Sequence, residues 1–304
     1  MSWLIFSIIA YFLLAVVSLF DRFFLVGSIP NPKSYAFNIG VLGFFASLLF
    51  LPFRFYLDPT VIFFGLLAGV IRILAVYFLA KSIAEDEVSR AVPTIGGFSA
   101  VFSFFLFLLF IPIPQSGQVI LYQLLAFILL LAGSILISLK DFSLKSFSYK
   151  VLKYPLVSAF LYALNFLLIK KLFIWSSFPT TVFLVLLGGG LGAFSFLIYP
   201  KNREELLNQQ FSQETPIIFF LAQALGGIAL SLQYYSIFLA QPHQVPIIQA
   251  LEGTRFLFLL FMVRALYQYE PELLKEEVDE KSLKQKVIAI VLIGFGLFFL
   301  YLYR

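Results

Sequence analysis

The chain has 304 residues; 61% of them are hydrophobic, 12% are charged, and none is cysteine. A soluble fold of this size cannot bury so much apolar surface in one core, and the composition also excludes a disordered chain and a disulfide-linked secreted domain. The formal net charge of +5 is small, and the basic residues flank apolar runs, so no nucleic-acid partner is expected. The composition therefore predicts an integral membrane protein that crosses the lipid bilayer several times.

Uncharged runs along the chain predict helical spans, because a span needs about 20 apolar residues with closed backbone hydrogen bonding. Two runs exceed the length of one span: residues 91–139 divide at Pro112 and Pro114, and residues 215–251 divide at Pro242. An all-α protein with ten spans follows, over residues 1–20, 34–53, 59–80, the two parts of 91–139, 154–169, 172–200, the first part of 215–251, a helix that begins near Val245, and 287–303.

Charged pairs mark two of the expected span ends. Asp21 and Arg22 follow the first apolar run, and Lys170 and Lys171 follow the sixth. No basic segment opens the first run and no small-residue cleavage site follows it, so we expect a retained helix and not a signal peptide.

The two halves of the chain are similar to each other. A shift of 157 residues (from 69 to 226) places Gly69 on Gly226, and the same shift aligns three further identical pairs: Tyr77 with Tyr234, Val88 with Val245, and Gly96 with Gly253. Residues 1–142 and 143–304 would then each hold five spans. Because five is odd, the two repeats would insert with opposite orientations, an arrangement that suits alternating access to a site between them.

The segments that carry this internal similarity resemble the drug/metabolite transporter superfamily, specifically its EamA-type members. The matching features are Val92-Pro93 and Gly96-Gly97 in the first half, and Pro246 and Gly253 in the second. The resemblance implies two five-helix repeats and a transport function. It also implies a central site lined by helices three, four, eight and nine.

Orientation is predicted differently by two arguments. Lys and Arg lie mainly in the loops that follow odd-numbered spans, which places those loops in the cytoplasm and both termini outside. The family resemblance implies both termini inside. We follow the charge distribution for this chain.

Charges inside the spans are the sharpest candidates for a functional site, because a charge in the hydrocarbon needs a partner or a cavity. Glu252 and Arg255 are three residues apart and so share one helix face. They could line a translocation pathway or form a neutralised pair that fixes helix packing. Arg72 could also line the pathway, snorkel, or pair with a carboxylate of the other half, and a Glu252–Arg72 bridge is one such pairing.

Uncharged polar side chains in the spans form a second group of candidates. They can hydrogen-bond a substrate or join two helices. Gly188, Gly189, Gly190 and Gly192 are expected to allow close helix packing, with bending of the helix as the alternative. Glu85, Asp86, Glu87 and Arg90 fall at an interfacial break, and His243 falls in a loop. The substrate-binding candidates are Tyr77, Gln223, Tyr234 and Gln249, beside Glu252, Arg255 and Arg72, with Asn165 as a further polar position.

These features predict a secondary active transporter that moves a small metabolite across a membrane, expected to be the plasma membrane. An anionic or zwitterionic solute fits Arg72 and Arg255; the coupling proton or ion and the oligomeric state stay open. The alternative is a non-transporting accessory subunit or scaffold with the same fold, in which Glu252 and Arg255 form a closed pair. No nucleophile–base pair, Walker motif or metal-ligand spacing is present, so no catalytic residue, cofactor or metal is expected.

Overall fold

The computed structural model describes residues 2–55, 57–85, 88–110, 149–207, 215–267 and 280–302, together with 125–126, 128–129, 132–133 and 136. Within these residues the regular structure is entirely helical, which confirms the predicted all-α class. The elements are α1 (Ser2–Phe23), η1 (Phe24–Ser28), α2 (Pro32–Ser47), η2 (Leu48–Phe50), α3 (Pro59–Glu85), α4 (Val88–Phe110), α6 (Tyr149–Trp175), α7 (Phe178–Phe194), η4 (Ser195–Ile198), α8 (Pro200–Leu207), α9 (Thr215–Leu239), η5 (Pro242–Gln244), α10 (Val245–Ala250), α11 (Gly253–Tyr267) and α13 (Glu280–Leu302).

Seven helical stretches in the described part are long and apolar enough to cross a membrane. They correspond to seven of the ten predicted spans. The fifth predicted span lies largely outside the described residues, the ninth is divided between α10 and α11, and α13 begins with charged residues. The seven stretches are Ser2–Ser28, Pro32–Phe50, Pro59–Glu85, Ala91–Phe110, Leu152–Trp175, Phe178–Ile198 and Thr215–Leu239.

The first and sixth spans extend beyond their predicted ends. Helix α1 passes through Asp21 and Arg22 and continues into the π-helical turn η1, so both charged side chains are buried. The Arg22 guanidinium donates a hydrogen bond to the carbonyl of Ile83 at the end of α3. Helix α6 likewise passes through Lys170, whose ammonium donates to the carbonyls of Ile237 and Ala240 at the end of α9. The charges therefore mark the last turn of α1, as predicted, but both apolar stretches continue past them, to Ser28 and to Trp175.

Helices α2 and α7 begin and end in the same way. Asn31 caps α2 by accepting from the Lys33 amide, and Ser177 caps α7 by accepting from the Thr180 amide. Proline follows each cap in the first turn, where its missing N–H costs nothing. Each helix then tightens at its far end into a 3₁₀ turn, η2 or η4.

Helices α3 and α7 approach each other closely at glycines. A Cβ atom added to Gly188 would overlap the backbone of Leu66, and one added to Gly69 would overlap the α7 backbone around Gly189. A Cβ at Gly190 would meet the Phe44 side chain of α2. These contacts confirm the predicted packing role of the Gly188–Gly192 segment.

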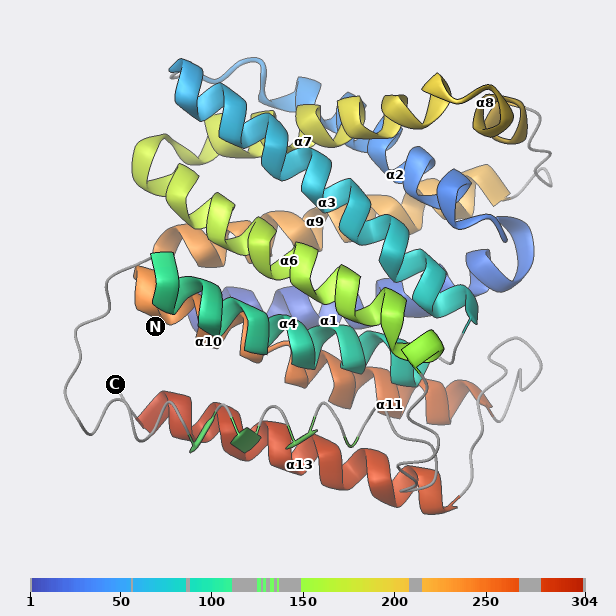
Figure 1. Ribbon diagram of the computed structural model, residues 1–304, viewed down its shortest axis with the longest axis vertical. Helices are drawn as coiled ribbons and strands as arrows, with labels where there is room; N and C mark the ends of the chain where they lie inside the picture. The colour runs from blue at the N-terminus through green and yellow to red at the C-terminus, as the bar shows by residue number, and fades with distance from the viewer. Residues whose placement is uncertain are drawn as a thin grey trace.

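The remaining helices place their ends on two opposite sides of the bundle (Figure 1). Helix α1 packs along α9, and α6 packs against both α3 and α4. Helix α11 lies between α4 and α13, with α13 at the edge of the bundle. The beginning of α1 and the end of α13 lie at the same side in Figure 1, and the beginnings of α2, α6, α9 and α13 lie at the other.

Candidate functional site

The predicted ninth span is interrupted at Leu251 and Glu252, between α10 and α11. The amide of Glu252 bonds to the carbonyl three residues back, on Gln249, at 3.1 Å. The amide of Arg255 does the same with the carbonyl of Glu252, at 2.9 Å. This tightening replaces the regular four-residue ladder of an α-helix, so the expectation of one continuous helix was wrong.

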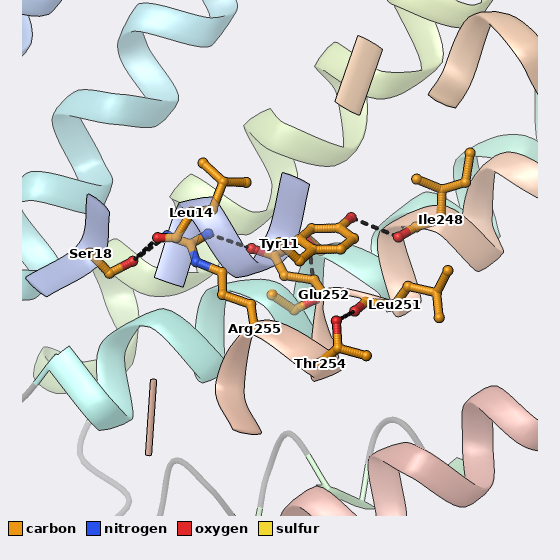
Figure 2. Close-up of polar contacts among 10 residues, drawn as sticks. Tyr11, Leu14, Ser18, Ile248, Leu251, Glu252, Thr254 and Arg255 are labelled. Atoms are coloured by element: carbon orange, nitrogen blue, oxygen red, sulfur yellow. Dashed lines mark hydrogen bonds and ion pairs between the residues drawn. The ribbon is translucent and has the colours of Figure 1, made fainter. Parts of the chain in front are cut away.

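The break releases a backbone carbonyl that α1 then satisfies. Because the Glu252 amide bonds to Gln249, the carbonyl of Ile248 has no helical partner from that residue. The Tyr11 hydroxyl donates to this carbonyl at 2.6 Å, as Figure 2 shows. Non-helical backbone inside a membrane is tolerated only where protein or water satisfies it. Tyr11 therefore supplies the hydrogen bond that the Ile248 carbonyl lacks at the break.

Glu252 and Arg255 contact each other directly, as their spacing predicted. Arg255 Nη1 lies 2.8 Å from Glu252 Oε1, and Arg255 Nη2 donates to Ser18 Oγ of α1 at 2.6 Å (Figure 2). The Ser99 side chain of α4 also interacts with the Glu252 carboxylate. The charged pair is thus held by α1, α4 and the break between α10 and α11.

Several buried polar atoms of the bundle, two of the residues being Arg255 and the nearby Gln249, have no hydrogen-bond partner in the described part of the chain. Both amide atoms of Gln249 are unpartnered although its side chain is only 1% exposed. The Tyr234 hydroxyl, also 1% exposed, the Ser103 hydroxyl and Arg255 Nε are unpartnered as well. Buried polar groups are almost always hydrogen-bonded, so these atoms require an explanation such as an absent ligand or water.

Arg72 lies on α3, half-buried, and interacts electrostatically with the Tyr234 and Tyr162 hydroxyls. Tyr162 on α6 also interacts with Arg255 and Glu252, so it connects the two charged positions. Among the described residues Arg72 forms no ion pair with Glu252. The Glu252 carboxylate pairs with Arg255 instead. The Glu252–Arg72 bridge was therefore a wrong expectation.

Gln223 belongs to a second polar cluster, which we call the Asp21 cluster. It comprises Asp21 on α1, Tyr35 on α2 and Gln223 on α9. The Tyr35 hydroxyl donates to Asp21 Oδ1, and Gln223 Nε2 donates to the Tyr35 hydroxyl at 3.1 Å. The Asp21 cluster is linked to the first site through the electrostatic interaction of Asp21 with Arg255.

Tyr77 and Asn165 take other roles. The Tyr77 ring lies near the end of α3, where it contacts the Lys81 ammonium and the Phe196 ring. The side-chain amide of Asn165 donates to the carbonyl of Ala68 at 2.8 Å, which joins α6 to α3. Asn165 therefore follows the structural alternative given for it.

The polar residues predicted at helix breaks are described only in part. Glu85 is exposed at the end of α3. Asp86, Glu87 and the side chains of Arg90 and His243 lie outside what the structure describes. No three His, Cys, Asp or Glu side chains group as a metal site would require within the described ranges.

Sequence reasoning missed Tyr11, Ser18, Asp21 and Tyr162. The first three were recoverable: Tyr11, Ser18 and Asp21 are seven and three residues apart, so they lie on one face of a helix that runs past Arg22. The apolar residues 23–26 after Arg22 were the signal that the helix continues. Tyr162 carries no comparable signal, because tyrosine is common in an apolar helix.

Comparison with known proteins identifies the fold alone. No family model matches the chain, and no curated protein does. The chain is similar to a solved structure described as "Crystal structure of protein", with a TM-score of 0.58 and 12% sequence identity. The match covers 98% of this chain and 94% of that chain, so the arrangement of helices is shared over nearly the full length of both.

Proposed function

We propose that the protein is a secondary transporter of the EamA type, in which a small solute binds beside the break between α10 and α11. The observation that carries this proposal is the interrupted helix, with an ion pair at the break and an unpartnered buried amide on Gln249 in the turn before it. Discontinuous helices place charged and polar groups at the substrate sites of many transporters.

Paired contacts support two inverted five-helix repeats. The shift that relates the halves in sequence carries Ile83 to Ala240. The carbonyl of Ile83 accepts from Arg22 of the first helix, and the carbonyl of Ala240 accepts from Lys170 of the sixth. The shared capping and 3₁₀ ends of α2 and α7 add a second pair of corresponding features. Alternating access would exchange the conformations of the two repeats.

The chemistry of the site favours a solute that carries a carboxylate or another anionic group. Arg255 Nε has no partner in the described part, and Arg72 has no ion-pair partner there. An anionic solute could take a place beside Arg255, while the Gln249 amide and the Tyr234 hydroxyl donate to or accept from it. A zwitterion would use the Glu252 carboxylate as well.

A second candidate is a membrane accessory subunit or scaffold that transports nothing. The closed Glu252–Arg255–Ser18 arrangement favours it, because the pair neutralises itself and connects α1 to α11. Under this alternative the unpartnered atoms would bind water, and substituting either charge would change stability without changing any solute distribution.

The test compares metabolites inside and outside cells that express the wild type, Glu252→Gln or Arg255→Gln at matched membrane levels. We expect at least one solute to be redistributed by the wild type and by neither variant, since each substitution removes half of the pair. The matched controls are Glu204→Gln and Arg203→Gln, because both residues are exposed on α8. These controls should behave as the wild type.

Two outcomes would contradict the transporter. The metabolite profiles of wild-type and non-expressing cells could be identical. Alternatively, both site variants could redistribute solutes as the wild type does while they unfold more easily, which is the signature of the scaffold.

A further inference from the structure

Asp21 is a buried carboxylate to which the proposed site gives no role. Asp21 is 5% exposed, and it lies within the first membrane-spanning stretch, three residues before the start of the π-helical turn η1. π-helical turns are rare in proteins, and those that occur often lie at functional sites. An acidic group at this depth is costly and usually binds an ion, a proton or a charged partner.

The partners that bond Asp21 in the described part are neutral. The Tyr35 hydroxyl donates to it, the Gln223 amide nitrogen donates to that hydroxyl at 3.1 Å, and the Gln223 side chain also hydrogen-bonds Asp21. The neighbouring Arg22 directs Nη1 to the carbonyl of Ile83 instead. Hydrogen-bond donors thus occupy the carboxylate, whereas a metal cation would need several oxygen ligands there.

The Asp21 cluster joins α1, α2 and α9, which meet without the close glycine contact that α3 and α7 make. Gly69 of α3 is wedged against the α7 backbone, but its sequence counterpart Gly226 on α9 meets only side chains, with Val17 the nearest at 3.7 Å. The next residue, Gly227, has no atom within 4 Å of an added Cβ. On this side of the bundle, hydrogen bonds among α1, α2 and α9 replace the close glycine contact between α3 and α7.

We propose that Asp21 is a proton-binding site, separate from Glu252, whose protonation rearranges the hydrogen bonds that join α1, α2 and α9. The ionised carboxylate accepts from Tyr35 and Gln223. The protonated form carries its own hydrogen and loses its attraction to Arg255. A proton bound there would therefore loosen the junction of the three helices and weaken the link to the Glu252–Arg255 pair. As the coupling site of a transporter, this assignment rests on the proposed function; as a proton-binding site, it does not.

The groups that interact with Asp21 come from four other helices. They are Tyr35 on α2, Tyr162 on α6, Gln223 on α9 and Arg255 on α11, while Arg22 is its neighbour in the chain. Among them Asp21 is the carboxylic acid, so it is the member of this set that gains a proton on acidification.

The test is an infrared titration of the purified full-length protein in lipid nanodiscs, from about pH 9 to about pH 5. We expect acidification of the wild type to produce a carboxylic acid C=O stretching band that moves on exchange into D2O. The band should be absent from Asp21→Asn and retained in Glu252→Gln. In Tyr35→Phe it should appear about one pH unit higher, because the ionised carboxylate has lost a donor.

The result that overturns the proposal is a wild-type protein without such a band over this range, or a band that Asp21→Asn retains in full. Tyr35→Phe keeps the test decisive if Asp21→Asn does not fold, since an unshifted titration in that variant also overturns the assignment. The measurement needs no solute. A titrating Asp21 in a protein that moves no metabolite would leave the proton site standing and remove the transporter.

Discussion

Tyr11 shows how one side chain makes an interrupted helix tolerable in an apolar bundle. Its hydroxyl is buried and donates to the Ile248 carbonyl, which the tightened turn at Glu252 leaves without that helical partner. An unpaired carbonyl in such surroundings costs more than a typical hydrogen bond contributes in water. The tightened turn fixes the backbone of Glu252 and the start of α11, which carries Arg255, so the Glu252–Arg255 pair depends on it.

Replacing Tyr11 with Phe should therefore lower the free energy of unfolding by about 1–3 kcal/mol, because it removes the donor and leaves the carbonyl buried. Tyr235→Phe is the matched control: the Tyr235 ring packs against Phe6 and Phe178 and is partly exposed. The measurement is equilibrium unfolding in mixed detergent micelles, followed by tryptophan fluorescence. Equal losses in the two variants would show that the hydroxyl of Tyr11 does not support the break.

Helix ends in this protein are satisfied by cations from other helices. Lys170 donates to the carbonyls of Ile237 and Ala240, and Arg22 donates to the carbonyl of Ile83. The last carbonyls of a helix lack internal partners and carry partial negative charge, so a buried cation is favourable there. These two contacts fix the ends of α9 and α3 against α6 and α1.

Lys170→Met should consequently destabilise the protein by about 2 kcal/mol, because two charge-assisted hydrogen bonds are lost and part of that loss is offset by no longer burying a charge. Its neighbour offers the control. Lys171 is half-buried and lies over the Phe110 ring at 5.2 Å, so Lys171→Met should cost less than about 1 kcal/mol. Thermal unfolding of both variants in the same detergent checks this difference, and a reversed order would refute the capping role of Lys170.

At the scale of the helices, the sequence predicts most helices but misplaces their ends and interruptions. Apolar runs identify the spans, since hydrocarbon demands continuous helix. A charged residue in the sequence, however, suggests the end of a span. Asp21 and Lys170 show that a charged residue with a partner distant in sequence can lie within a span. Tyr35 and Gln223 meet across 188 residues of sequence, and Tyr11 bonds the Ile248 carbonyl at the break across 237 residues. No local pattern encodes such pairings.

On the scale of the whole molecule, the distribution of basic residues along the chain predicts an orientation in the membrane. Arg22 and Lys170 leave the loop count once they are placed within spans, and the excess of Lys and Arg still follows the odd-numbered spans. One side of the bundle includes α8 and the beginnings of α2 and α6, while the beginning of α1 and the end of α13 lie at the other side (Figure 1). The positive-inside rule therefore still predicts that α8 lies on the cytoplasmic side and both ends of the described chain on the other.

The absence of cysteine from the sequence allows a direct test of this orientation. We expect a single cysteine at Ser2, which is exposed at the start of α1, to react with a membrane-impermeant maleimide in intact cells. A cysteine at Glu204, exposed on α8, should react only after the membrane is permeabilised. The opposite pattern would place the ends inside, as the EamA resemblance implies, and would mean that the charges of this chain do not set its topology. Reaction of both positions in intact cells would contradict the placement of α1 and α8 at opposite sides of the membrane.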